Sequence, residues 1–109
     1  MTCNLKVAYN PPVEIDALFK ALADPTRRQI LVELSSRNGQ TLYELCAKLM
    51  MVHKLDMSRQ GISKHLDALE ETKLITITWN GREKLHYLNS DPLIKVQEWL
   101  KVLSKSGRK

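Results

Sequence analysis

The sequence predicts a mainly α-helical domain with one β-hairpin, in the order helix, helix, helix, helix, hairpin, helix. Two observations lead to this prediction. Apolar residues recur at helical spacing in five segments, four of which follow a Ser, Thr or Asp that can cap a helix. Between residues 74 and 88 the apolar period changes from helical to alternating, on both sides of the pair Asn80-Gly81.

Length and composition indicate a single soluble domain. At 109 residues the chain can build a modest core but not a second domain. No apolar run is long enough to span a membrane, and residues 1–12 lack the basic and apolar segments of a secretory signal. We therefore expect a cytoplasmic protein with no membrane contact. Seventeen basic against twelve acidic residues give a net charge of +5, which favours a polyanionic partner without requiring one.

The domain is expected to span residues 13–104, after an irregular arm over residues 1–12. The pair Pro11-Pro12 is expected to keep the arm out of a helix, because the residue before a proline disfavours the helical conformation. A first helix is then predicted over residues 13–23. Its apolar positions at helical spacing are Ile15, Leu18, Phe19, Leu22 and Ala23.

A second helix is predicted from Pro25 to about Arg37. Asp24 is a good N-cap, and Pro25 fits the first helical position because the amide that it lacks would have no partner there. Arg27 and Arg28 lie near the start of this helix, where a positive charge is unfavourable for the helix dipole. They are either a solvated pair or have another use.

The third helix begins with a capping box. Thr41 stands at the N-cap and Glu44 three residues later, where the two side chains can satisfy each other's backbone amides. The following segment, residues 50–57, is too apolar for a plain loop and too long for a tight turn. We expect the helix to continue to about Lys54 and residues 55–57 to form the connection.

The fourth helix is predicted over residues 58–72, with Ser58 as its cap. One face is an apolar stripe of Ile62, Leu66 and Leu69. The opposite face opens with the hydrogen-bond donors Arg59, Gln60, Ser63 and Lys64, and carboxylates appear only later. With the third helix it forms a helix-turn-helix pair, and its donor-rich end suits the DNA major groove. An ordinary amphipathic surface helix has the same pattern.

A β-hairpin is predicted over residues 74–88. The first strand is rich in β-branched and aromatic residues, and Asn80-Gly81 is the favoured pair for a two-residue type I′ turn. A hairpin directly after a helix-turn-helix pair is a wing.

The last helix starts after Ser90-Asp91-Pro92, which supplies a cap and a proline in the expected order. Its apolar residues cover more than the one stripe that a single subunit can bury, which indicates a partner subunit. A basic tail is expected over residues 105–109.

Three stretches of the chain carry a family resemblance. Residues 18–31, LFKALADPTRRQIL, resemble the second-helix signature of ArsR-type winged-helix repressors. Ser63-Lys64-His65-Leu66, followed by Leu69-Glu70 and Leu74-Ile75, is similar to their recognition helix and its exit. Residues 81–88, GREKLHYL, resemble the wing of one subgroup. The resemblance covers residues 13–100 in the family's order.

The resemblance implies a dimeric winged helix-turn-helix fold with the element order α-α-α-α-β-β-α. It also implies a homodimeric repressor that binds double-stranded operator DNA near a promoter and releases it in response to a signal, here an inducer of unknown identity. Two-fold symmetry would bring two recognition helices to successive major grooves of a palindromic operator, about 34 Å apart. The first and last helices are expected to form the dimer interface through Leu18, Phe19, Leu93, Val96, Trp99, Leu100 and Leu103.

The DNA contacts are expected from the fourth helix, the wing and the start of the third helix. Arg59 can bind guanine and Gln60 adenine through two hydrogen bonds each. Together with Ser63 and Lys64 they are candidates for contacts with bases and phosphates, or with phosphates alone. His65 is expected to pack or to lie near a phosphate.

The wing and the third helix supply the remaining candidates. Arg82, with Lys84 beside it, is placed to enter a minor groove at the wing tip. Thr41 and Tyr43 can hold a phosphate at the start of the third helix.

The motifs of the metal-sensing family members are incomplete in this chain, so no metal or cofactor is expected. Members that bind soft metals carry paired cysteines in the third helix, where this chain has only Cys46. Members that bind zinc use a histidine on the last helix, which here has Asp91 and Glu98 but no histidine. Cys3 and Cys46 meeting across a dimer, as a soft-metal site or a redox pair, remains an alternative.

Two other functional classes compete with a DNA-binding repressor. A winged-helix module that binds only other proteins explains the fold and the dimer equally well. An enzyme is disfavoured, because the chain lacks a nucleophile–base constellation and its four glycines form no phosphate-binding loop.

Overall fold

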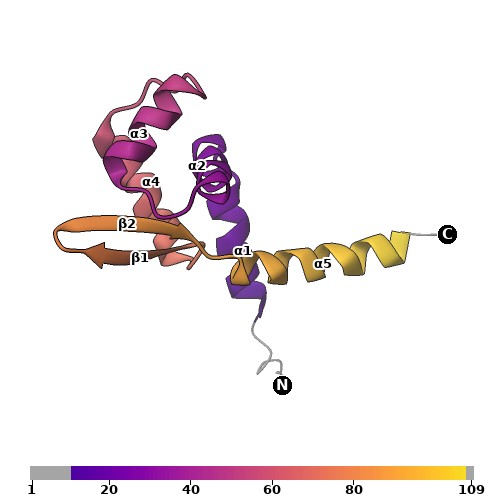
Figure 1. Cartoon of the computed structure of the whole chain (residues 1–109). Coiled ribbons are helices and arrows are strands. Elements are labelled where there is room, and N and C mark those ends of the chain that lie inside the picture. Colours follow the sequence, from indigo (N-terminus) through magenta and orange to yellow (C-terminus); the bar gives the residue numbers. More distant parts are fainter. Residues whose placement is uncertain (1–10, 108–109) are drawn as a thin grey trace.

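The computed structural model describes residues 11–107. Its elements follow the predicted order (Figure 1). They are α1 (Pro11–Leu22), α2 (Pro25–Ser36), α3 (Leu42–Met51), α4 (Arg59–Glu71), β1 (Ile75–Asn80), β2 (Glu83–Leu88) and α5 (Asp91–Gly107). Helices α2, α3 and α4 pack together and against the hairpin. The hairpin and α5 project from this body in opposite directions (Figure 1). The predicted winged helix-turn-helix architecture is confirmed.

The core lies where α2, α3, α4 and β1 meet. Nine apolar side chains contributed by these elements and the residue before β1 are almost completely excluded from solvent, which makes apolar burial the main stabilising term. They are Ile30, Leu34, Leu45, Leu49, Ile62, Leu66, Leu69, Leu74 and Ile75. The three residues of the predicted α4 stripe are among them, so the position of α4 is fixed by its apolar face.

Three predicted helix caps are present. The Asp24 carboxylate accepts hydrogen bonds from the backbone amides of Thr26 and Arg27 at 2.8 and 3.1 Å. At the start of α3 the side chains of Thr41 and Glu44 bind each other's backbone amides, as the capping box predicts. The Ser58 hydroxyl accepts from the amide of Gly61 at 3.0 Å.

The first helix starts earlier than the sequence predicted. It begins at Pro11, so Pro11-Pro12 is part of the helix and does not lie in an irregular arm. Both prolines occupy the first turn, where their missing N–H groups would have no intrahelical partner. Proline disrupts a helix only when it lies beyond the first turn, where its missing N–H removes an intrahelical hydrogen bond.

The third helix ends earlier than predicted, at Met51 instead of about Lys54. Lys54 adopts a left-handed conformation with φ of 59°, and the amide of Leu55 donates to the carbonyl of Leu49 at 3.1 Å. The left-handed residue past the helix end reverses the chain, and it turns Leu55 back toward the core. This helix end was not predictable from the sequence, because a lysine holds the position that glycine usually takes.

The hairpin turn lies one residue further along than predicted. Asn80 pairs with Glu83, so the two turn residues are Gly81 and Arg82 and not Asn80-Gly81. Of these two, only Gly81 has a positive φ, which is the pattern of a type II′ turn instead of type I′. The register is fixed at the base of the hairpin, where Ile75 lies opposite Leu88.

The last helix is regular from Asp91 to Gly107 and includes residues 105–107 of the expected basic tail. None of the helices in the described part of the chain combines the length and the apolarity that crossing a membrane requires.

Candidate nucleic-acid interface

The outward face of α4 carries two of the predicted DNA-binding residues. Gln60 and Lys64 are exposed and stand opposite the buried stripe, since each helical residue advances by about 100° around the axis. Both lie in the N-terminal half of α4. The exposed Asp67 and Glu71 follow on the same face in the C-terminal half. This face therefore changes from donors to carboxylates along its length.

Two further candidates on α4 are turned toward the hairpin. Arg59 and Ser63 line a groove of about 800 Å³ that is bounded by the start of α3, by α4 and by β2. Lys84 lines the same groove. The carboxylates along its walls are Glu44, Asp67, Glu70 and Glu83. Carboxylates thus outnumber the lysine and arginine side chains there, so Arg59 shares its groove with several acidic groups.

His65 occupies the opposite flank of α4. Its ring Nδ1 accepts a hydrogen bond of 3.1 Å from the Nε of Arg27 on α2. The side chain is half-buried and directed at another helix, and not at the outer face. The structure thereby gives Arg27 a defined partner, which the sequence could not identify because the two residues are 38 positions apart.

The start of α3 has fewer free donors than a phosphate site there would need. The amide of Thr41 donates to the Glu44 carboxylate at 2.9 Å, and the amide of Glu44 is bound to the Thr41 hydroxyl at 3.1 Å. The hydrogen bond from the Thr41 backbone, together with Arg37, lowers the pKa of Glu44 against the opposing effect of burial. A negative charge thus already occupies this helix terminus. Tyr43 remains 70% exposed.

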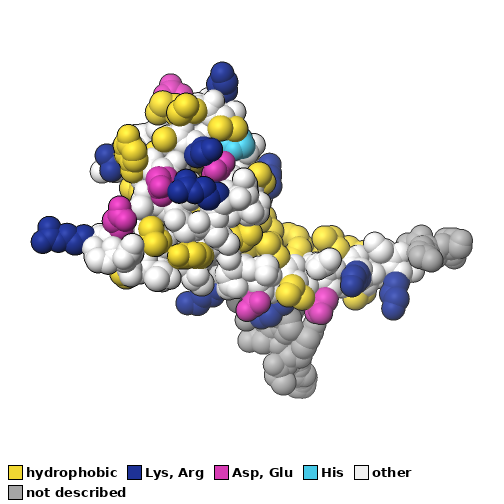
Figure 2. All heavy atoms as spheres, in the orientation of Figure 1, with side chains coloured by type: hydrophobic (Ala, Val, Ile, Leu, Met, Phe, Trp, Pro, Cys, Tyr) yellow, Lys and Arg dark blue, Asp and Glu magenta, His cyan; other side chains and the backbone are white. Residues whose placement is uncertain are grey.

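The tip of the hairpin is basic and exposed. Arg82 is a turn residue, and a basic side chain projects at this end of the molecule in Figure 2. Lys84 is also exposed, two residues along β2.

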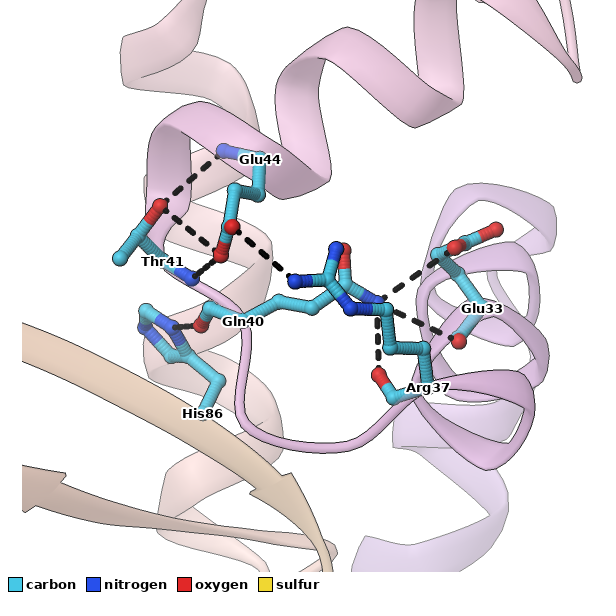
Figure 3. Close-up of polar contacts among 6 residues, drawn as sticks. All are labelled: Glu33, Arg37, Gln40, Thr41, Glu44 and His86. Carbon is cyan, nitrogen blue, oxygen red and sulfur yellow. Dashed lines mark hydrogen bonds and ion pairs between the residues drawn. The ribbon is translucent and has the colours of Figure 1, made fainter.

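A buried polar cluster joins the hairpin to the helix-turn-helix. Figure 3 shows Gln40, in the loop before α3, pointing its backbone carbonyl at His86 of β2. The Gln40 side-chain amide donates to the carbonyl of Arg37 at 2.6 Å and lies 3.4 Å from the Glu33 carboxylate. Burial lowers the pKa of His86, while its hydrogen bond to Gln40 acts in the opposite direction. The burial of Gln40 and His86 could not be predicted from the sequence, because polar residues in short loops and strands carry no signal of burial.

The predicted dimer residues divide into buried and exposed groups. Leu18 and Val96 are buried within the subunit. Trp99 meets Phe19 edge-on with 5.3 Å between ring centroids, yet it remains 43% exposed. Leu100 and Leu103 are about half exposed, whereas Leu93 packs against the core.

Of the two cysteines, the structure describes only Cys46. Cys3 lies outside the described residues. Cys46 packs against the core, and burial raises the pKa of its thiol despite the nearby positive charge of Arg59. Among residues 11–107 the structure brings together no cluster of three His, Cys, Asp or Glu side chains suited to a metal ion.

Comparison with known proteins identifies the family. The family described as "Helix-turn-helix domain" matches residues 22–78. The uncharacterised HTH-type transcriptional regulator YuzN of Bacillus subtilis is 49% identical over 78 residues, which cover 72% of this chain and 85% of that protein. The arsenical resistance operon repressor of Staphylococcus xylosus is 30% identical over 87% of this chain and 85% of its own length. This chain belongs to the ArsR family.

Solved ArsR structures agree with this assignment. An ArsR-like transcriptional regulator from Rhodococcus sp. RHA1 superposes with a TM-score of 0.74 and is 33% identical, over 86% of this chain and 80% of that one. ArsR proteins are transcriptional regulators and not enzymes, so the chain is a transcriptional regulator of this family with a helix-turn-helix domain.

Proposed function

We propose that this ArsR-family regulator is a homodimeric repressor that binds a palindromic operator, with α4 in the major groove and the β1–β2 hairpin as the wing. The observation that carries the proposal is the outward face of α4. Gln60 and Lys64 are exposed opposite a fully packed apolar stripe, in the N-terminal half that reaches base edges when such a helix docks. Carboxylates occur only beyond them, where a docked helix leaves the groove.

The hairpin supports a second contact with the same duplex. Arg82 is exposed at the turn, and an arginine at this position suits a narrow minor groove beside the major-groove site. The pairing of Gln40 with His86 holds the base of the hairpin against the helix-turn-helix. The wing therefore keeps a defined distance from α4.

The dimer is supported by the outer half of α5. An apolar stripe runs along this helix through Val96, Leu100 and Leu103, with Trp99 at its edge. Its first part is buried against the chain's own core, but beyond Val96 the stripe is exposed. Figure 2 shows hydrophobic side chains on this projecting part of α5. A second copy related by two-fold symmetry would cover it and would set two α4 helices for successive major grooves.

Selection of bound sequences from random duplex DNA tests the proposal. The expected winner is a palindrome with half-site centres one helical turn, about 10 base pairs, apart. Affinity for it should fall steeply as salt rises, because binding to phosphates releases counterions. Enrichment of single half-sites would contradict the dimer, and no enrichment would contradict sequence-specific binding.

A protein-interaction module is the second candidate, because one apolar surface is left open outside α5. Met50, Met51 and Val52 at the end of α3 are each more than half exposed and adjacent. If this patch binds another protein and DNA is not the partner, binding to any duplex will be weak and insensitive to salt. A salt titration with the selected duplex, or with random duplex if the selection enriches none, separates the two candidates.

A further inference from the structure

We propose that Arg27 of α2 contacts a DNA phosphate, and that His65 of α4 is the positioning residue that directs the Arg27 side chain to it. This inference rests on the proposed DNA binding and extends it to a helix outside the helix-turn-helix pair and the wing. It also gives His65 a role different from direct contact with DNA.

The geometry fixes one edge of the Arg27 guanidinium and leaves the rest open. The Nε–H group donates to Nδ1 of His65 at 3.1 Å. Among the described residues no partner accepts a hydrogen bond from the two terminal nitrogens of Arg27. Asp24 interacts electrostatically with Arg27, but its hydrogen bonds go to the backbone amides of Thr26 and Arg27 and not to the guanidinium. The guanidinium thus keeps four unused donors, a number suited to a phosphate.

The start of α2 lies beside the N-terminal half of α4. The Thr26 hydroxyl donates to the Sδ of Met57, just before α4, at 3.6 Å, and Arg27 bonds to His65 on the flank of α4 next to its outward face. The hydrogen bond therefore holds the Arg27 side chain beside the N-terminal half of α4 and prevents it from swinging freely in solvent. A restrained arginine loses less side-chain entropy on binding a phosphate than a free one.

The neighbouring arginine provides a matched control. Arg28 lies in the same turn of α2 and carries the same charge, but its guanidinium donates to the backbone carbonyl of Leu22 at 2.7 Å. That bond directs it to the end of α1 and away from α4. The two arginines therefore differ in direction and not in charge, so a purely diffuse electrostatic effect would make them equivalent.

The test compares operator affinity and its salt dependence for Arg27→Ala, Arg28→Ala, His65→Leu, His65→Asn and the double variant Arg27→Ala/His65→Leu. Arg27→Ala should weaken binding about tenfold and reduce the salt slope by about 1 per subunit, whereas Arg28→Ala should change both far less. His65→Leu should also weaken binding, but by less than Arg27→Ala, because Arg27 is still present and only its restraint is lost. His65→Asn should restore most of the affinity, since the amide oxygen can accept from Nε at nearly the same place.

The double variant decides whether His65 acts through Arg27. If it does, the double variant will bind no more weakly than Arg27→Ala alone. Additive losses would overturn the positioning role and make His65 a direct contact. Equal losses for Arg27→Ala and Arg28→Ala would overturn the phosphate contact. Both results would leave the proposed repressor function intact, which fails only if the unaltered protein binds no selected duplex. Circular dichroism of each variant checks that the fold is retained.

Discussion

The backbone carbonyl of Gln40 accepts two hydrogen bonds from His86, one from its backbone N–H and one from its ring Nδ1, each 2.8 Å long. The first belongs to a short bridge that adds the loop before α3 to the edge of the hairpin. The second uses the side chain and requires a proton on Nδ1. Because Gln40 also binds the end of α2 through its amide, one residue joins α2, α3 and the wing.

This pair predicts a loss of stability in mild acid. Burial lowers the pKa of His86 below its ordinary value of 6.5, so the unfolded chain takes up a proton before the folded chain does. The contribution of His86 to the free energy of unfolding is therefore complete above about pH 6.5. It should decrease as the pH falls from there toward the lowered pKa. Urea unfolding at several pH values between 5 and 8 measures the slope.

His86→Asn is the control for that slope. Asparagine keeps a side-chain donor but does not titrate, so the variant is expected to be less stable at neutral pH with a flatter pH dependence. An identical slope in both proteins would show that the acid sensitivity does not come from His86.

The proposed recognition helix predicts unequal effects for two of its basic residues. Arg59→Ala combined with Lys64→Ala should abolish operator binding and leave a folded dimer. As single changes, Lys64→Ala should weaken binding more than Arg59→Ala, because Lys64 is on the outward face and Arg59 shares a groove with carboxylates. Mobility shifts with the selected duplex compare them. A double variant that binds normally would refute the assignment of α4.

The proposed interface predicts that Trp99→Glu gives a monomer. A carboxylate in the apolar stripe of α5 would be buried without a partner in the dimer, at a cost of several kcal/mol. Sedimentation measures the mass. Ile94→Glu is the matched control, since Ile94 is similarly exposed at 47% but stands on the other side of α5. If Trp99→Glu still sediments as a dimer, the interface lies elsewhere.

Two glycines with positive φ should differ in their tolerance of alanine. Gly81 (φ 65°) has open space where a Cβ would stand, so Gly81→Ala should cost about 1–2 kcal/mol of backbone strain alone. At Gly39 (φ 76°) a Cβ would also approach the Tyr87 hydroxyl oxygen to 3.1 Å and its ring carbons to 3.2 Å, so Gly39→Ala should cost about 3 kcal/mol. Thermal unfolding measures both. Equal losses would mean that Tyr87 moves aside freely.

The sequence was sufficient for the architecture because its local signals agree with one another. Each of these signals is a local pattern of a few residues: the caps at Asp24, Thr41 and Ser58, and the apolar stripe on α4. The predictions were wrong at the end of α3 and at the hairpin turn, where tertiary contacts determine the local conformation. Lys54 adopts a left-handed conformation because Leu55 gains burial, and no local pattern marks that exchange. The turn at Gly81 shifted because the register is set at the other end of the hairpin.

The candidate site was predictable in residue type but not in direction. Arg59 and Gln60 are neighbours that both carry hydrogen-bond donors, and the sequence pattern predicted both on the same face of α4. The structure turns Gln60 outward and Arg59 toward the hairpin, since the angle around α4 depends on which residues pack beneath it. Long-range partners such as Arg27 and His65 require the folded chain.

In the proposed dimer, the exposed outer half of α5 would link the stability of each subunit to the amount of protein present. Leu100 and Leu103, about half exposed in the single chain, would gain burial from a second copy, so the unfolding midpoint should rise with protein concentration. Operator occupancy would then depend on the square of the free subunit concentration. A modest fall in expression would relieve repression before any inducer binds.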